Sequence, residues 1–278
     1  MNVLSLFDGM SCGQIALDKL GIKVNKYFAS EIKKSAIEVT QHNYPNTIQL
    51  GDVTKIKSKD LPKIDLLIGG SPCQDFSRAN KERKGVEGEK SSLFFEYIRL
   101  LKECKPKYFL LENVIMSDYN YWFICNELNC EPVRLCGSLV SGALRDRLYW
   151  TNIPPFSYDL TGRLISQITT PKDKLITLSS ILDSGYVKTR KHTCLNTGSG
   201  NGGKQKYLIH RNNTTGMITL IYEDDYVRTV NQNEMEQLHN IPKGYTSIVN
   251  QKKAGDLIGD GWTVDIVKHI FKGIKKNI

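Results

Sequence analysis

The residue best suited to nucleophilic chemistry is Cys73, which follows the segment IDLLIGGSP. The apolar residues from Ile64 to Ile68 are typical of a buried parallel strand, and Gly69-Gly70 ends it without bulky side chains. Pro72 fixes its own φ and has no N–H, so we expect Cys73 on a stiff turn just past the carboxyl end of the strand. Open α/β sheets bind their ligands at this edge. The pattern predicts a nucleophile, although a cysteine without this setting is more often a small buried apolar residue.

Acidic side chains stand at the ends of three other predicted strands. Asp8, with Gly9 and Gly13, forms a strand-to-helix turn that lacks the complete G-x-G-x-x-G of dinucleotide enzymes. Glu31 and Asp52 close the next two strands. Carboxylates at these positions suit ribose hydroxyls and an adenine amino group, and they favour a cationic sulfonium ligand such as S-adenosylmethionine over a phosphate-bearing one. Each acid could instead be a helix cap or a solvated loop residue.

Further polar groups follow later in the chain. Glu112 and Asn113 end the segment KYFLLENV, a strand expected beside that of Cys73. Arg145 and Arg147 alternate with an aspartate, so both would point to one face of a strand. Surface ion pairing is the other interpretation of this pair.

These side chains require a sheet whose strand ends bring them together. We expect strands over Asn2–Phe7, Val24–Ala29, Ile48–Val53, Ile64–Ile68, Lys107–Val114, Val133–Ser138 and Arg147–Ile153. We expect helices over Ser11–Leu20, Ile32–His42, Ser91–Cys104, Tyr119–Leu128, Asn233–His239 and Thr263–Lys275. The alternation predicts an α/β fold with a doubly wound, mostly parallel sheet. The charged run Arg78–Lys90 suits a mobile loop over a cleft.

The chain divides into three parts by composition. Residues 1–155 form the predicted catalytic and cofactor-binding domain, and residues 226–278 return to it. Between them, residues 156–225 are polar and irregular, with a flexible-looking centre at Asn196–Gly203, and we expect a small separate lobe there.

The charge balance favours a polyanionic partner but also fits an ordinary basic enzyme, since 38 Lys and Arg face 29 Asp and Glu. The 7 cysteines form no C-x-x-C pair, which predicts a reduced protein without a metal. The start of the chain is unlike a secretory signal, and no apolar run has the length of a membrane span. We therefore expect a cytoplasmic protein, or a nuclear one in a eukaryote.

Several of these motifs occur together and in order: DGMSCG, SEI, GDV, GGSPCQDFS, LLENV, RDRLYW and GDGWTVDIV. This series resembles the cytosine-5 DNA methyltransferases, and it is most similar to the catalytic domain of the animal de novo enzymes. It covers about residues 1–155 and 226–278, and residues 156–225 take the place of the target-recognition segment. The resemblance implies a Rossmann-like, S-adenosylmethionine-dependent enzyme of double-stranded DNA, restriction-linked or solitary, from a bacterium or phage.

The resemblance also implies roles for the catalytic residues. The thiolate of Cys73 would add to C6 of a cytosine, which makes C5 nucleophilic enough to take the methyl group. Glu112, preferably as a carboxylic acid, would bind N3 and the amino group. Arg147, with Arg145 beside it, would hold O2 and a phosphate, and Asn113 would brace the turn of Pro72 and Cys73. The base must be flipped out of the duplex, and the loop Gln74–Lys90 would close behind it.

The implied cofactor pocket draws on five parts of the sequence. Its residues would be Phe7, Asp8, Gly9, Met10, Ser11, Cys12, Glu31, Ile32, Asp52, Val53, Leu93, Asp260, Gly261 and Trp262. One departure is that Asp260 stands where the family usually has Asn or Arg. The recognition segment is also short, which suggests a short target sequence.

Alternatives stay open at this stage. The same fold and chemistry serve tRNA cytosine-5 methyltransferases, and the motifs do not separate the two substrates. A silent nucleic-acid-binding relative is disfavoured because Cys73, Glu112 and Arg147 are all present. A nicotinamide oxidoreductase is weaker still, since the glycine fingerprint is incomplete. The sequence does not indicate the oligomeric state.

Overall fold

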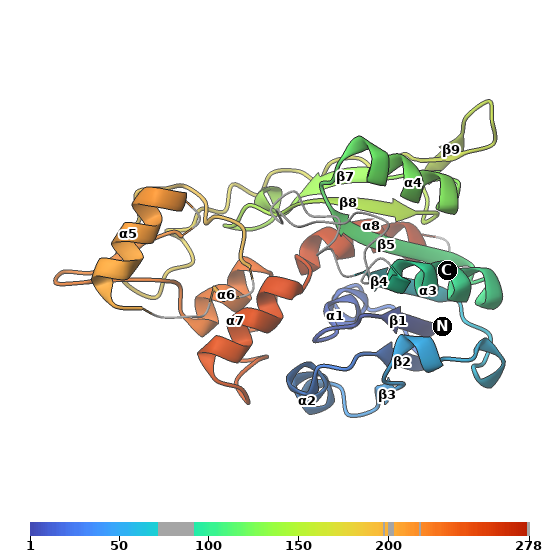
Figure 1. Ribbon diagram of the computed structural model, residues 1–278, viewed down its shortest axis with the longest axis horizontal. Helices are drawn as coiled ribbons and strands as arrows, with labels where there is room; N and C mark the ends of the chain where they lie inside the picture. The colour runs from blue at the N-terminus through green and yellow to red at the C-terminus, as the bar shows by residue number, and fades with distance from the viewer. Residues whose placement is uncertain (72–91, 197, 200–202, 217, 277–278) are drawn as a thin grey trace.

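A central sheet of 7 strands organises the molecule, in the order β3-β2-β1-β4-β5-β8-β7 (Figure 1). The computed structural model describes residues 1–71, 92–196, 198–199, 203–216 and 218–276. The strands are β1 (Asn2–Leu6), β2 (Lys26–Ser30), β3 (Ile48–Gln49), β4 (Leu66–Gly70), β5 (Tyr108–Val114), β7 (Val133–Cys136) and β8 (Asp146–Thr151). The first five in sheet order are parallel, whereas β8 is antiparallel to β5 and β7 is antiparallel to β8. The predicted α/β fold with a mostly parallel sheet is confirmed.

Alternate residues of each central strand enter different cores. In β4, Leu66 and Ile68 belong to one apolar cluster and Leu67 to the other. In β5, Leu110 and Leu111 divide in the same way. Because successive side chains of a strand point to opposite faces, a near-continuous apolar run is buried on both sides. The sheet is therefore the middle of three layers.

Helices cover both faces of the sheet. The helices that line or connect its strands are α1 (Cys12–Asp18), α2 (Lys34–Asn43), α3 (Ser92–Cys104), α4 (Asp118–Leu128) and α8 (Val264–Lys275). α1 and α8 pack together in one cluster, while α3 lies in the other with Phe94 and Tyr97 fully buried. Gly273 of α8 permits the closest approach, since a Cβ there would lie 1.8 Å from the Pro154 carbonyl oxygen.

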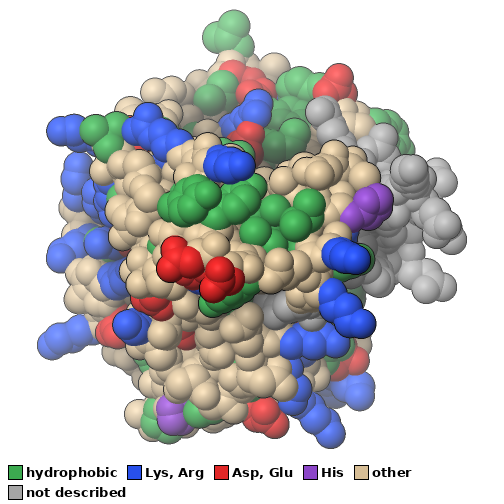
Figure 2. All heavy atoms as spheres, turned by 90° about the vertical axis from the view of Figure 1, so that its left-hand side faces the viewer, with side chains coloured by type: hydrophobic (Ala, Val, Ile, Leu, Met, Phe, Trp, Pro, Cys, Tyr) green, Lys and Arg blue, Asp and Glu red, His purple; other side chains and the backbone are tan. Residues whose placement is uncertain are grey.

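The remaining elements lie beside the sheet. β9 (Phe156–Tyr158) and β10 (Leu164–Ser166) form a small sheet with β6 (Cys130–Glu131), and β11 (Ile221–Tyr222) pairs with β12 (Val227–Arg228). The helices α5 (Gln205–Thr215), α6 (Gln232–Leu238) and α7 (Gln251–Asp260) lie to the left in Figure 1, and α6 and α7 share the core cluster of α1 and α8. Their side of the molecule carries Lys and Arg at its margins and apolar side chains near its centre (Figure 2).

Two helices were not predicted. α5 buries only Leu208, so it has no apolar stripe to mark it in the sequence, and the expectation of an irregular segment there was wrong for these residues. α7 buries Gly255 and Gly259 along with three apolar residues, and glycine is unfavourable inside a helix. Among the described residues, no helix is long and apolar enough to cross a membrane.

Candidate active site

Glu112 is the acid at the centre of the candidate active site. It lies near the end of β5, opposite Gly70 of β4 and Tyr149 of β8. Its side chain is 8% exposed. Arg147 Nε lies 2.9 Å from Glu112 Oε1 in an ion pair, and Trp262 Nε1 donates a hydrogen bond to Glu112 Oε2 at 3.1 Å. Both carboxylate oxygens are therefore oriented by partners from distant parts of the chain.

Gly70 makes this arrangement possible. A Cβ at this position would lie 2.9 Å from Glu112 Oε2 and 3.0 Å from Trp262 Nε1. Such contacts are shorter than real Cβ atoms make, so any side chain here would displace the acid or the indole. The end of β4 therefore lies directly against the acid of β5.

Asn113 holds the residue that follows β4. Its Nδ2 donates to Ser71 Oγ at 3.1 Å, and its Oδ1 accepts from the Val114 N–H at 2.8 Å. Pro72 and Cys73, the next residues, lie outside the described part of the chain, as does the Gln74–Lys90 loop. The observed bond orients Ser71, and the expected bracing of Pro72 and Cys73 stays a prediction.

Arg145 and Arg147 reach the same sulfur atom. Arg145 Nη1 lies 3.7 Å and Arg147 Nη2 3.9 Å from Cys194 Sγ. Arg145 also donates to the Leu195 carbonyl oxygen at 3.3 Å. The intervening Asp146 turns the other way and pairs with Arg134. Alternation along the strand thus directs both guanidinium groups to residues 194–195, a contact that the sequence did not reveal.

A neutral histidine lies near the arginines. His239 is 1% exposed, and neither of its ring nitrogens has a hydrogen-bond partner among the described residues. Burial lowers the pKa of His239 well below its usual value, and the nearby charges of Arg145 and Arg147 lower it further. An uncharged imidazole leaves the arginines as the local cations, which suits binding of an anionic or oxygen-bearing group.

Glu31 ties the first turn of the chain to the end of β2. Its Oε2 accepts from the Gly9 N–H at 2.8 Å, and its Oε1 accepts from the N–H groups of Ile32 and Lys33 at 2.7 and 2.8 Å. Gly9 has φ +59°, and a Cβ there would meet nothing within 4 Å. The space beside this turn is open, and Glu31 is fixed at its edge.

Asp8 lies inside the same turn. Its Oδ1 accepts from the Tyr27 hydroxyl at 2.8 Å, and Ser11 Oγ donates to its Oδ2. Burial raises the pKa of Asp8 to about 6, because desolvation outweighs these hydrogen bonds. Phe7 and Ser11 have φ of 56° and 62°, so the turn holds a left-handed conformation on both sides of Gly9.

Ile32 and Asp52 are two further residues expected to bind the cofactor. The side chain of Ile32 is 75% exposed beside Glu31. Asp52 caps a short turn, with Oδ1 accepting from the Thr54 N–H and hydroxyl at 3.0 and 2.9 Å, and these bonds lower its pKa. The interpretation of Asp52 as a cap is therefore correct for this oxygen.

Several expected residues turn their side chains into the core. These are Met10, Cys12 and Val53, which are at most 4% exposed, while Leu93 packs partly against one apolar cluster. A ligand could therefore contact Met10, Cys12 and Val53 only through their backbone, whereas it could contact the side chain of Leu93. Gly261 lies against Cys12, since a Cβ there would be 3.1 Å from Cys12 Sγ, and Asp260 pairs with Lys33 at 3.3 Å. The late segment thus contacts Cys12 at the end of the first turn, and its part in cofactor binding stays a prediction.

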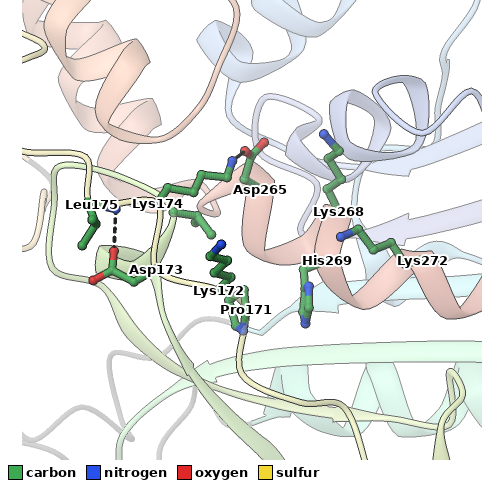
Figure 3. A pocket seen from close by; sticks show the side chains of 10 residues that line it. Pro171, Lys172, Asp173, Lys174, Leu175, Asp265, Lys268, His269 and Lys272 are labelled. Carbon is green, nitrogen blue, oxygen red and sulfur yellow. Dashed lines mark hydrogen bonds and ion pairs between the residues drawn. The ribbon is translucent and has the colours of Figure 1, made fainter.

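The described part of the chain places no three His, Cys, Asp or Glu side chains where they could hold a metal ion. Two hollows of its surface lie away from Glu112, and the larger runs beside α8 (Figure 3).

Comparison with known proteins bears on residues 1–117, which match the family model described as C-5 cytosine-specific DNA methylase. The resemblance to the cytosine-5 DNA methyltransferases is confirmed over these residues. They include Glu112 and Asn113, whereas Arg145, Arg147 and Trp262 lie beyond them.

Curated methyltransferases are similar over the same part. The orphan methyltransferase M.Rho11sI of Bacillus phage rho11s is 47% identical over 116 residues, which are 41% of this chain and 23% of that protein. The type II methyltransferase M.NlaIV of Neisseria lactamica is 45% identical over 115 residues, 40% of this chain and 27% of that protein. The matches span about a quarter of the length of these relatives.

Solved methyltransferases share the fold along the whole chain. The S. pombe Dnmt2 methyltransferase has a TM-score of 0.71 at 17% identity and covers 100% of this chain and 99% of its own. The Entamoeba histolytica methyltransferase EhMeth has a TM-score of 0.74 at 14% identity, covering 100% and 98%. This chain therefore shares the fold of these solved methyltransferases.

Proposed function

We propose that this protein transfers a methyl group from S-adenosylmethionine to C5 of a flipped-out cytosine in double-stranded DNA, through a covalent bond between Cys73 and C6. The observation that carries the proposal is the position of Glu112, oriented by Arg147 and Trp262 and lying against Gly70. From Gly70 the chain continues through Ser71 to Pro72 and Cys73. The acid and the nucleophile therefore come from neighbouring parallel strands that end at one edge of the sheet.

The proposed reaction has three steps: addition of the thiolate, transfer of the methyl group and elimination. The thiolate of Cys73 forms a bond to C6, and the electron pair of the C5–C6 double bond becomes available at C5. C5 would then form a bond to the methyl carbon that the bound cofactor supplies, and the electron pair of the broken sulfur–carbon bond would stay on sulfur. Removal of the C5 proton by a base then restores the double bond and expels the thiolate from C6.

Glu112 and the arginines would act on the cytosine ring. A carboxyl group beside N3 and the amino group offsets the charge that develops when the thiolate adds. As a carboxylic acid, Glu112 would donate its proton to N3 and would keep acceptor positions for Trp262, Arg147 and the cytosine amino group. Arg147, in contact with the acid, would reach cytosine O2, and the buried Arg145 beside it would complete the positive wall.

The cofactor-binding residues fit S-adenosylmethionine. When bound, this cofactor supplies an activated methyl group on a sulfonium centre. The open side of Gly9 admits a ligand close to the backbone, and the exposed Ile32 offers an apolar surface to an adenine ring. Glu31 retains one acceptor position, on Oε2, for a ribose hydroxyl after its three backbone bonds.

We further propose the division into a catalytic part, residues 1–155 and 226–278, and a target-recognition lobe, residues 156–225. The likeness of the first 117 residues to enzymes of a bacterium and a phage supports a setting in the cytoplasm of a bacterial or phage-infected cell.

The test is transfer of labelled methyl from S-adenosylmethionine to duplex DNA and to tRNA, side by side, followed by mapping of the methylated cytosines. Cys73→Ala should abolish transfer while the cofactor still raises the melting temperature. Cys104→Ala, a half-buried cysteine at the end of α3, is the matched control and should remain active.

Duplex DNA that contains 5-fluorocytosine provides a second readout. Without a C5 proton to remove, wild-type protein should stay covalently attached to the DNA in a denaturing gel, and Cys73→Ala should not. Methyl transfer to tRNA and not to DNA would show that the substrate is RNA. Normal turnover by Cys73→Ala would refute the mechanism.

A further inference from the structure

A basic groove runs beside α8, away from the residues that contact Glu112. It encloses about 690 Å³ between the helix and residues 171–175, and it is lined by Val140, Pro171, Lys172, Asp173, Lys174, Leu175, Asp265, Lys268, His269 and Lys272 (Figure 3). Four lysines thus face two aspartates across this space. Asp265, in the first turn of α8, is the groove residue nearest in sequence to Trp262.

The two aspartates are already engaged by the protein. Asp265 pairs with Lys19 at 3.3 Å and also with Lys174. These lysine contacts hold its pKa below the usual value although burial opposes them. Asp173 accepts from the Leu175 N–H at 2.7 Å and so shapes its own loop.

Three lysines have no carboxylate partner within the described part of the chain: Lys172, Lys268 and Lys272. The last two stand four residues apart on one face of α8, where like charges destabilise a helix by about 0.2–0.5 kcal/mol. Lys272 extends toward His269, whose Nε2 lies 2.7 Å from the Thr169 carbonyl oxygen (Figure 3). The groove therefore concentrates positive charge that the fold leaves unbalanced.

We infer that this groove binds phosphates of the DNA backbone outside the target base, as a second contact that rests on the proposed function. Lys268 and Lys272 are four residues apart in α8 and so lie about 6 Å apart along the helix axis. Each strand of B-DNA carries a phosphate about every 3.4 Å along its axis, so a strand lying along α8 offers a phosphate to both lysines. The groove also contains two aspartates, which would repel a small anion enclosed between its walls. A DNA strand suits it better, because each phosphate can contact the lysines of one wall and stay clear of the aspartates.

The salt dependence of DNA binding tests this inference. The variant Lys172→Ala, Lys268→Ala, Lys272→Ala should reduce the slope of log Kobs against log salt by about 2–3 on a duplex of about three turns, since each lost phosphate contact removes about 0.9. On a duplex of about one turn, which covers little beyond the target, the slope should change by less than about 1. An unchanged slope on the long duplex would overturn the inference.

Matched variants separate charge from folding. Lys23→Ala, Lys26→Ala, Lys63→Ala removes three exposed lysines near the amino ends of β2 and β4, none of which lines the groove, and should leave the slope unchanged. Replacement of the three groove lysines by arginine keeps the positive charge and should therefore leave the slope unchanged. Loss of the slope in the arginine variant would point to a folding defect and count against the groove.

Tripolyphosphate serves as the probe for a free anion. If it raises the melting temperature in a manner that depends on the groove lysines while the DNA slope is unaffected, the site takes a small anion and the DNA inference fails. Because binding is measured without methyl transfer, a reduced slope in a protein that methylates no DNA would leave the groove intact and reject only the proposed function.

Discussion

Trp262 donates its indole N–H to Glu112 across 150 positions of sequence. The same indole lies 3.4 Å from the place where a Cβ of Gly13 would be, in the helix that follows the first turn. One side chain therefore touches the proposed cofactor-binding turn, the end of β4 and the proposed catalytic acid. Trp262 therefore connects the expected cofactor residues to Glu112. We propose that it positions Glu112 in addition to binding the cofactor.

Trp262→Phe should lower kcat by about 10- to 100-fold with a smaller effect on KM for S-adenosylmethionine. Phenylalanine retains an aromatic ring but not the donor, and a hydrogen bond to a charged group contributes about 1.5–3 kcal/mol. Steady-state kinetics measure the split between kcat and KM. Trp122→Phe, at a side chain that is 46% exposed on α4, is the matched control and should be neutral. Equal losses for both tryptophans would argue against the positioning role.

Glu112→Gln should lower kcat at least about 100-fold and reduce stability by about 1–3 kcal/mol. The amide is similar in size, but it leaves the largely buried Arg147 without its carboxylate partner. Labelled methyl transfer and urea unfolding measure the two effects. Glu131→Gln, whose partner Arg163 lies 3.8 Å away, should be nearly silent in both. Full activity of Glu112→Gln would exclude the acid from the chemistry.

Cys194→Ala should reduce methyl transfer by about 3- to 10-fold, because Arg145 and Arg147 lose the acceptor that they share, a change of about 1 kcal/mol. Cys194→Ser keeps an acceptor and should restore most of the activity. Cys136→Ala, another half-buried cysteine, serves as control. If serine and alanine at position 194 behave alike, the sulfur does not orient the arginines.

Asp8 should make the cofactor-free protein less stable as the pH rises. Its folded pKa of about 6 exceeds the ordinary 3.8, so the folded state binds more protons than the unfolded state between these values. The contribution is fully present below about pH 4 and is lost through about pH 6, with a size on the order of 1–3 kcal/mol.

Urea unfolding at several pH values should show this slope in wild-type protein and in Asp60→Asn, whose side chain is exposed. In Asp8→Asn the slope should be absent, since an amide does not titrate. A slope that persists in Asp8→Asn would assign it to another group.

Most strands could be predicted because burial on two faces leaves apolar runs that need no knowledge of distant residues. The strand expected over Ile48–Val53 was too long, since β3 ends at Gln49 and Val53 begins a short helical turn that Asp52 caps. Glu112 and the chain leading to Cys73 were expected together for the same reason, since neighbouring parallel strands end at one edge. The cofactor residues stay a prediction. Met10, Cys12 and Val53 belong to turns that match the family, yet their side chains pack into the core. A motif specifies which backbone approaches a ligand but not which way each side chain turns.

The amino-acid sequence by itself determined the parallel α/β sheet, the acids at its strand ends and the alternation that sends Arg145 and Arg147 to one side, because local periodicity encodes which face each residue takes. Only the tertiary structure decided that Trp262 and Cys194 complete the site and that Lys172 faces Lys268 across a groove. These contacts join residues far apart in the chain, and their distances depend on how the layers pack, with Gly70 and Gly273 permitting the closest approaches. No local pattern records such packing.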